Sequence, residues 1–305
     1  MIKIVFSLIM FLFALGGFVR AQERDETAKY VYEDNKRLVA LVEQAASLVE
    51  KKGANAFAEF GVKDSRWLND KHYIFVYDME GVCVFHPIES YFIGRDLSKL
   101  KDMNGRQVIA MITDVGKNSR PDASGWVFYL WEQPWHIYLQ WKGSYIRKAV
   151  APGGKVYLVG SGLYNIKIEK SFVQQHVDSA AALILARGKE AAFAELSLSS
   201  SSLHIMGNYI SVLAENGDIV VDPLFPNLDK KRNAMGFRDS TGRSFMKEMI
   251  KALRSRDAVW GQFIAPKSDP DRPTRQLWYL RSVVVGPEKF YVGMSFAPAV
   301  PVWMK

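Results

Sequence analysis

The chain of 305 residues contains very little cysteine, since Cys83 is the only one. An internal disulfide is therefore excluded, and with it the class of small secreted domains that depend on several disulfides. Cys83 lies within an apolar stretch, so we interpret it as a small buried hydrophobic residue rather than a redox group.

Long apolar runs are scarce too, because the sequence has a single one, from Ile4 to Val19. Lys3 precedes this run and Val19-Arg20-Ala21-Gln22 ends it, a pattern typical of a secretory signal peptide. The run is shorter than the roughly 20 residues that span a bilayer. We predict a signal peptide over residues 1–21, cleaved after Ala21, and a periplasmic protein without a stable membrane span. A retained N-terminal anchor is the alternative.

Motifs of catalysis and metal binding are missing. The sequence has no Gly-x-Ser-x-Gly, no His-Glu-x-x-His, no phosphate-binding loop and no dinucleotide glycine pattern. Its five histidines lie on separate predicted elements without the spacing of a zinc site. We therefore expect no enzyme activity, no metal and no cofactor.

A concentrated patch of one charge is also lacking, although the formal net charge is +8. The basic residues are scattered and not interleaved with aromatic residues on one face, which argues against a nucleic-acid partner. A scattered positive excess favours a small organic anion or an anionic membrane surface as the partner.

What the sequence does contain is an internal repeat. Residues 73–87 return as 209–223, and residues 56–60 return as 192–196. Later matches follow in the same order; they pair Asp102-x-x-Gly-Arg106 with Asp239-x-x-Gly-Arg243, Trp126 with Trp260, Tyr145-Ile-Arg147 with Tyr279-Leu-Arg281, and Val159-Gly160 with Val292-Gly293. These matches occur in the same order in both copies, and the separation in sequence between paired residues changes only slowly. This pattern predicts two similar modules in tandem.

Each copy shows the pattern of a helix, two strands, short helices and three strands. In the first copy the helix falls over 37–49, the hairpin over 73–87, and the last strands over 126–131, 142–150 and 155–162. This order predicts an α+β fold, in which a long N-terminal helix covers one face of a five-stranded antiparallel sheet. Residues 164–181 are predicted as the opening helix of the second copy.

Seven motifs of the first copy together resemble the single Cache domain, a PAS-like sensing module of bacterial chemoreceptors and sensor kinases. These motifs are Tyr73-Ile-Phe-Val-Tyr-Asp-x-x-Gly81, His86-Pro87, Gly94-Arg-Asp-Leu97, Asp102-x-Asn-Gly105, Gly125-Trp-Val-x-Tyr129-x-Trp131, Lys142-x-x-Tyr145 and Gly160-Ser-Gly162-x-Tyr164. The resemblance covers residues 30–165, and residues 166–298 resemble the same family more loosely. It implies two PAS-like Cache modules and binding of a small molecule, commonly a short carboxylate, between the sheet and a cap of loops and short helices.

The resemblance also implies a signalling partner. Cache modules usually continue through a membrane segment into a signalling domain, whereas this sequence ends at Lys305. We therefore expect an exported sensing protein without its own transmembrane output domain, acting with a membrane sensor kinase or chemoreceptor. The alternative is a protein-interaction subunit of such a kinase or receptor that binds no small molecule.

Strand alternation places Tyr73, Phe75 and Tyr77 on one face of the sheet and Ile74 and Val76 on the other. Aromatic walls with a few cationic donors suit a small acid, because an unpaired carboxylate out of water costs several kcal/mol. We expect the ligand site to consist of Tyr73, Phe75, Tyr77, His86, Trp126, Tyr129, Trp131, Lys142 and Tyr145, with Lys142 and protonated His86 as the anion partners.

Each candidate also has a structural interpretation. The aromatic residues could belong to the core, Lys142 to a solvated strand edge, and His86 to a strand-end hydrogen bond. Arg147 and Arg281 suit salt bridges, and Asp102 and Asp239 suit the capping and turning of a helix. In the second copy, Asp222 replaces His86 and Gln276 replaces Lys142. We therefore predict that the first copy holds the anion, while the second binds another ligand or serves only as structure.

Overall fold

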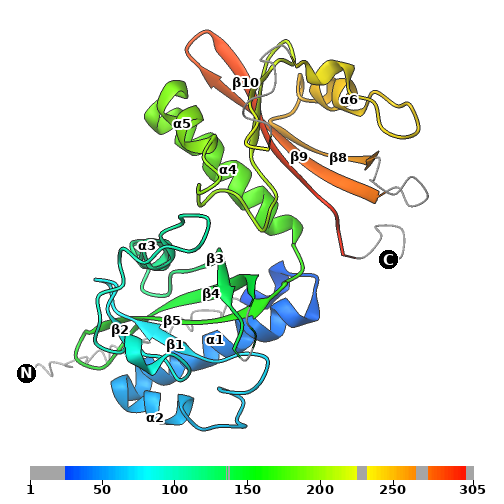
Figure 1. The fold of residues 1–305 in the computed structure, drawn as a ribbon. Coiled ribbons are helices and arrows are strands. Elements are labelled where there is room, and N and C mark those ends of the chain that lie inside the picture. Colours follow the sequence, from blue (N-terminus) through cyan, green and yellow to red (C-terminus); the bar gives the residue numbers. More distant parts are fainter. Residues whose placement is uncertain (1–24, 135, 137, 225–231, 266–273, 300–305) are drawn as a thin grey trace, which may run out of the picture.

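The computed structural model describes residues 25–134, 136, 138–224, 232–265 and 274–299. The predicted signal peptide, residues 1–21, lies outside these ranges. The described chain forms two halves, each built around a five-stranded antiparallel sheet (Figure 1). We call the half that contains β1–β5 the first module and the half that contains β6–β10 the second module.

The strands of the first module are ordered β2-β1-β5-β4-β3. The helix α1 lies along one face of this sheet and α3 along the other (Figure 1). The elements are η1 (Glu26–Lys29), α1 (Glu33–Lys52), η2 (Gly53–Ala56), α2 (Phe57–Phe60), β1 (Phe75–Tyr77), β2 (Cys83–Phe85), η3 (Ser90–Phe92), α3 (Val108–Gly116), β3 (Ser124–Glu132), β4 (Leu139–Val150) and β5 (Val156–Tyr164).

The second module repeats this topology, with strand order β7-β6-β10-β9-β8. Both hairpins carry a register shift at the matching place, between Val76 and Tyr77 and between Val212 and Leu213. Its elements are α4 (Lys170–Arg187), α5 (Lys189–Leu196), β6 (Ser211–Ala214), β7 (Ile219–Val221), η4 (Ala234–Gly236), α6 (Phe245–Ala252), β8 (Ala258–Ala265), β9 (Thr274–Val285) and β10 (Glu288–Phe296). The α+β fold with two matching sheets is confirmed.

The predicted alternation of β1 holds in the structure. Ile74 and Val76 pack with Ala45 and Val49 of α1, whereas Tyr73, Phe75 and Tyr77 pack on the opposite face with Ile109 and Ile112 of α3. Cys83 is fully buried, as its apolar surroundings predicted. The sheet therefore separates an aliphatic helix contact from an aromatic face under α3.

The connection between the modules differs from the prediction. Tyr164 belongs to β5 and the helix begins only at Lys170, so residues 165–169 are not helical. Glu169 is nevertheless fixed, because its carboxylate accepts hydrogen bonds from the backbone N–H groups of Val31 and Tyr32 and from the amide of Asn35. These bonds tie the connection to the start of α1.

Asp102 and Arg106 fasten the edge strand of the first sheet. Asp102 Oδ2 accepts the N–H of Leu130 at 3.0 Å, and Arg106 Nη1 donates to the carbonyl of Phe128 at 3.0 Å. The second module repeats the arrangement, with Asp239 near the N–H of Ile264 and Arg243 on the carbonyl of Gln262. We call each arrangement an Asp–Arg clip; it occupies edge-strand groups that would otherwise be open to pairing.

The predicted helix-capping role of Asp102 is wrong. Its Oδ1 accepts the N–H groups of Asn104 and Arg106 within its own turn, and the residue at the N-cap of α3 is Gln107. The predicted salt bridges hold, since Arg147 pairs with Glu43 and Glu50 and Arg281 pairs with Asp178.

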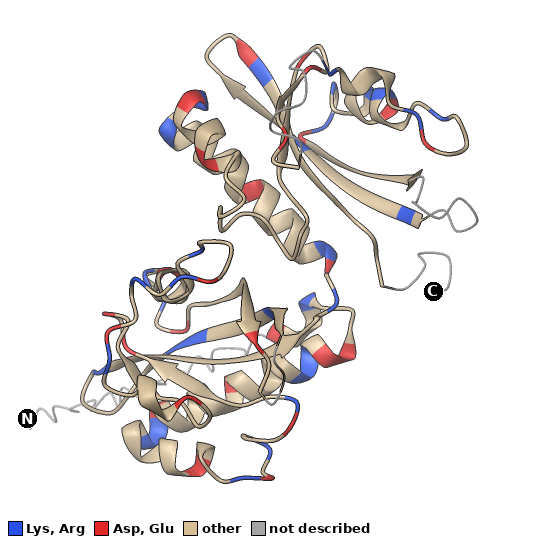
Figure 2. Ribbon diagram, in the orientation of Figure 1, with Lys and Arg blue, Asp and Glu red and all other residues tan. Residues whose placement is uncertain are grey.

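Charged residues of both signs are distributed along both modules (Figure 2). Figure 2 shows Lys and Arg interleaved with Asp and Glu on the helices and loops rather than gathered on one face. Within the described ranges, no helix combines the length and apolar character needed to cross a membrane.

Candidate ligand-binding site

A small cavity lies between the aromatic face of the first sheet and a cap, which we define as residues 86–116. Its volume is about 10 Å³, which is room for one water molecule at most. It is lined by Tyr73, Phe75, Tyr77, His86, Val108, Ile109, Ile112, Tyr129, Trp131 and Lys142. The structure thus brings together all but two of the residues expected from the sequence.

Lys142 is buried at the centre of this cavity, with 1% of its surface exposed. Nζ donates a hydrogen bond to the Tyr73 hydroxyl at 2.7 Å and lies 4.2 Å from the centre of that ring. Among the described residues, no carboxylate lies within 4.0 Å of Nζ. The alternative of a solvated strand edge is therefore wrong, and Lys142 is a cation without an adjacent counter-charge.

Burial lowers the pKa of Lys142 to about 7, although the charge of Glu89 acts in the opposite direction. An ammonium group loses much of its hydration in such a place, and one hydroxyl with aromatic rings replaces only part of it. A carboxylate that reached Nζ would restore the missing interaction through a charge-assisted hydrogen bond.

The glycines of Gly160-Ser-Gly162 make room for these side chains on β5. A Cβ atom at Gly162 would lie 2.7 Å from Lys142 Cε, and one at Gly160 would overlap the Phe75 ring. Ser161 points away and donates to the carbonyl of Tyr73 at 2.8 Å. The motif therefore lets Lys142 lie flat against the sheet under the cap.

His86 is buried at 3% exposure and is held by the cap. Nδ1 accepts the backbone N–H of Glu89 at 2.9 Å, so the ring proton of the neutral imidazole lies on Nε2. Burial, with a contribution from Lys142, lowers the pKa of His86 to about 3. The expectation of a protonated His86 that binds an anion is therefore wrong; His86 makes the strand-end hydrogen bond that was its alternative.

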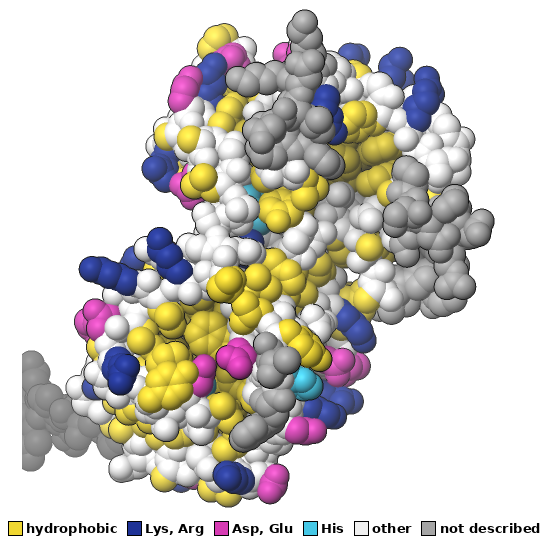
Figure 3. All heavy atoms as spheres, in the orientation of Figure 1, with side chains coloured by type: hydrophobic (Ala, Val, Ile, Leu, Met, Phe, Trp, Pro, Cys, Tyr) yellow, Lys and Arg dark blue, Asp and Glu magenta, His cyan; other side chains and the backbone are white. Residues whose placement is uncertain are grey.

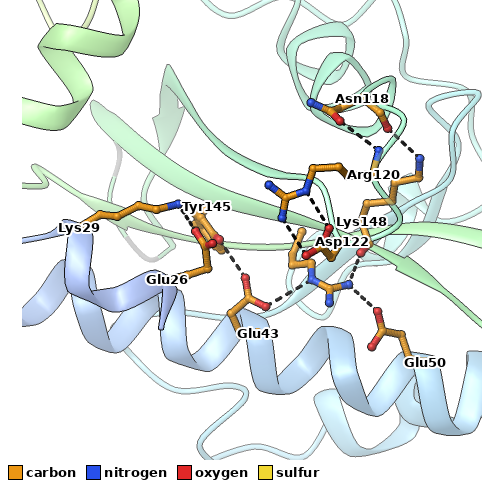
Figure 4. A network of polar contacts seen from close by, with 10 residues as sticks. Glu26, Lys29, Glu43, Glu50, Asn118, Arg120, Asp122, Tyr145 and Lys148 are labelled. Atoms are coloured by element: carbon orange, nitrogen blue, oxygen red, sulfur yellow. Dashed lines mark hydrogen bonds and ion pairs between the residues drawn. The ribbon is translucent and has the colours of Figure 1, made fainter. Parts of the chain in front are cut away.

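Trp126 and Tyr145 lie on the opposite face of the sheet. Trp126 Nε1 donates to the Tyr30 hydroxyl at 2.9 Å, and its ring packs on Phe172. The Tyr145 hydroxyl donates to Glu43 of α1 at 2.9 Å (Figure 4). Including them in the site was wrong, because each is an odd number of residues from its neighbour in the cavity and strand alternation sends it to the helix side.

Several residues of the site were not expected from the sequence. The Ser144 hydroxyl lies 2.8 Å from that of Tyr129, and the Tyr164 ring lies 5.2 Å from Lys142 Nζ. Even spacing from Lys142 and Gly162 could have revealed both. Glu89, whose charge acts on Lys142 from the cap, could not be found from even spacing, because it follows His86 in a loop rather than in a strand.

The sequence profile of the Cache domain family matches residues 25–179. The chain belongs to the Cache domain family. Among solved structures, a periplasmic sensor domain of a chemotaxis protein is 27% identical over 45% of this chain and 100% of its own, with a TM-score of 0.37. A Cache chemosensory domain described for carboxylic acid recognition is 23% identical over 44% and 94%, with a TM-score of 0.36. A methyl-accepting chemotaxis protein from Vibrio parahaemolyticus is 22% identical over 43% and 88%, with a TM-score of 0.35.

Cache domains are sensor domains that lie outside the cytoplasm and bind small molecules. They pass the binding signal to chemoreceptors or histidine kinases. Members of the family bind ligands rather than catalyse reactions. In the described part of this Cache protein, no three His, Cys, Asp or Glu side chains are grouped as metal ligands.

The second Cache-like module has different chemistry at the equivalent place. Gln276 lies opposite Phe263, as Lys142 lies opposite Tyr129 in the first module. Trp278 stands where the first module has Ser144, and the rings of Phe245 and Phe263 stack at 4.3 Å beside it. Asp222, the counterpart of His86, pairs with Arg232 at 2.8 Å. Aromatic packing thus fills the position that is polar in the first module.

Proposed function

We propose that the first Cache module, residues 30–165, is an exported sensor module that binds a small organic acid. The observation that carries this proposal is the buried Lys142 ammonium, which has a hydroxyl and aromatic rings as neighbours but, among the described residues, no carboxylate within 4.0 Å. The ligand carboxylate would pair with Nζ, and the aromatic rings of Tyr73, Phe75 and Tyr129 would exclude water. The second module, residues 166–298, would serve as structure.

Binding requires the cap to move. A cavity of about 10 Å³ holds no organic acid, so the cap residues that line it, His86 and those of α3, must shift away from Lys142. We propose that this shift is the signal, passed to a membrane receptor or kinase outside the cytoplasm. Cleavage of residues 1–21 would release the protein into the periplasm.

Thermal unfolding of the exported protein tests the proposal against a panel of short acids, with and without amino groups. A true ligand at about one hundred times its dissociation constant should add roughly 2.7 kcal/mol to the free energy of unfolding. Lys142→Met should abolish the gain. Lys148→Met is the matched control, because Lys148 lies on the same strand and bonds Asn118 outside the site (Figure 4).

Two outcomes would contradict the proposal: a flat response of the wild-type protein to every acid, or equal responses of the wild type and Lys142→Met. A flat response would favour the second function, an interaction subunit that binds no small molecule. The observation in favour of that function is apolar surface on the cap, where Tyr91, Ile93 and Met103 are 59%, 47% and 76% exposed. Figure 3 shows hydrophobic side chains gathered on one side of the first module.

A further inference from the structure

Backbone groups along part of β3, the edge strand of the first sheet, lack hydrogen-bond partners. Alternate residues of an edge strand direct their N–H and C=O groups away from the sheet, and β3 pairs only with β4. The Asp–Arg clip occupies two of these outward groups, the N–H of Leu130 and the carbonyl of Phe128. By the same alternation, the N–H of Phe128 and the N–H and carbonyl of Trp126 also point outward. Among the described residues, none forms a hydrogen bond with these three groups.

The open groups face a cleft of about 360 Å³ between the two modules, a size typical of ligand sites. Residues Ser124–Phe128 of β3 form its floor. Met111 and Val115 of α3 line one side, and Gln175 and His176 of α4 line the other. An extended chain that entered the cleft would therefore lie along the open edge, between the two helices.

The open stretch lacks the protection that edge strands usually carry. Natural edges are guarded by Lys, Pro or other charged side chains that prevent pairing with another chain, whereas Ser124–Phe128 reads Ser-Gly-Trp-Val-Phe. An unguarded edge suits strand addition, in which main-chain hydrogen bonds supply the affinity and alternate side chains supply the specificity. A second copy of this chain fits poorly, because its own α3 and α4 flank its edge and would meet these helices before the strands could pair.

The two sides of the cleft differ in chemistry. The side of α3 is apolar at Met111 and Val115. On the side of α4, His176 Nδ1 donates to the carbonyl of Leu203 at 3.2 Å, which leaves Nε2 as an acceptor. Because successive side chains of an added strand point to opposite sides, its apolar residues should face α3 and its polar residues should face α4.

The charge of the cleft also restricts its occupant. Asp114 is the only Asp, Glu, Lys or Arg among the described residues that line the cleft, and Lys117 pairs with its carboxylate at 2.6 Å. An ionised side chain that entered the cleft would lose hydration without gaining a free counter-charge. The cleft therefore suits an uncharged segment.

We propose that the open edge of β3 binds a short, uncharged, extended segment of a partner protein, which adds a strand to the first sheet. This interaction goes beyond the proposed function and does not depend on it. Among the described residues, none that lines the cleft also lines the cavity around Lys142. Binding of the segment and binding of an acid can therefore fail independently.

Peptides of about seven residues, long enough to cover Ser124–Phe128, provide the probe. A randomised library displayed on phage is selected on the exported protein, and the selected peptide is synthesised. We expect apolar and polar residues to alternate in this peptide. Ser202→Trp should fill the cleft and weaken its binding at least about tenfold. Ser199→Trp is the matched control, because Ser199 is an exposed serine of the same segment that does not line the cleft, and this variant should bind as the wild type does.

Methylation of single backbone nitrogens of the peptide gives a readout that needs no protein variant. In an added strand, every second N–H faces β3. A methyl group on one of these nitrogens should weaken binding at least about tenfold, while a methyl group on the nitrogens between them should have little effect.

Four outcomes would overturn the proposal. Three concern the peptide: no peptide is selected, its binding is unaffected by Ser202→Trp, or methylation has the same effect at every backbone nitrogen. The fourth is a dimer of the exported protein in size-exclusion chromatography that Ser202→Trp dissociates, because it would assign the open edge to a second copy of this chain.

Discussion

Arg106 of the first module donates one hydrogen bond to each module: Nη1 lies 3.0 Å from the carbonyl oxygen of Phe128 and 3.1 Å from that of His204. Both side chains are buried, at 2% exposure for Arg106 and 0% for His204. The guanidinium also covers the ring of Trp141 at 4.7 Å. Arg106 belongs to the cap, so the cap over the candidate site is bonded directly to the second module.

Replacing Arg106 should weaken the joint between the modules. In Arg106→Met, the carbonyls of Phe128 and His204 lose a charged donor while they stay buried, which should lower the free energy of unfolding by about 3 kcal/mol. Amide hydrogen exchange should rise in residues 198–210, the segment of the second module that contains His204. Denaturant unfolding and exchange mass spectrometry measure the two effects.

Arg243→Met is the matched control, because Arg243 holds the same position in the clip of the second module. Its side chain is 45% exposed and contacts Gln262 and Asp239 within its own module. We expect a loss of at most about 1 kcal/mol. Equal losses in the two variants, with no change of exchange in residues 198–210, would show that Arg106 does not join the modules.

The sequence predicted the sheets and most of the cavity because both depend on local alternation and on the repeat. The faces of β1 follow from Tyr73, Phe75 and Tyr77 alone, and the register of β4 follows from the match of Tyr145-Ile-Arg147 with Tyr279-Leu-Arg281. The errors at Trp126 and Tyr145 came from choosing residues by chemistry when their spacing placed them on the helix side.

The remaining features of the site could not be read from the sequence because they depend on tertiary contacts. Glu89 acts on Lys142 from a loop, and no periodicity describes a loop. The tautomer of His86 is set by the backbone N–H of Glu89, and its pKa is lowered by burial. The contact of Arg106 with His204 joins segments 98 residues apart. Each of these contacts forms only in the folded chain, so the sequence alone does not reveal it.

Lys142→Met should stabilise the protein while it abolishes binding of acids. Burial lowers the pKa of Lys142 to about 7, below its ordinary value of 10.5, so the unfolded state binds more protons between these two values. The wild type should therefore gain stability as pH rises through this window, by at most about 1.4 kcal/mol per pH unit from this group. Lys142→Met should lack this gain.

Urea unfolding of the wild type and Lys142→Met at several pH values between 7 and 10 measures the difference. The difference should be largest near pH 7, where the variant is more stable, and should shrink toward pH 10. A variant less stable than the wild type by a constant amount over the whole window would indicate that Lys142 is a satisfied structural residue.

Acid should destabilise the protein through two buried histidines, His86 and His204, and the partly buried His176. Burial lowers the pKa of His86 to about 3 and those of His176 and His204 to about 4. Because the unfolded chain takes up these protons near pH 6.5, stability should be complete above that pH and fall as pH decreases toward 4. His86→Gln should reduce the slope of stability against pH by about one proton. Exposed His136→Gln should leave it unchanged, and an equal effect of the two variants would contradict the prediction.

Gly162→Ala should disturb the site without adding a charge or removing a polar group. The new methyl would overlap the Ser144 hydroxyl and would lie 2.7 Å from Lys142 Cε, closer than real Cβ contacts, so both side chains must shift from their places against the sheet. We expect a loss of about 1–3 kcal/mol in the free energy of unfolding, as for other overpacked cores, and at least tenfold weaker binding of acids. Gly61→Ala is the control, because its methyl would meet nothing closer than 3.8 Å. If Gly162→Ala binds acids as the wild type does, the position of Lys142 against β5 is not what the ligand requires.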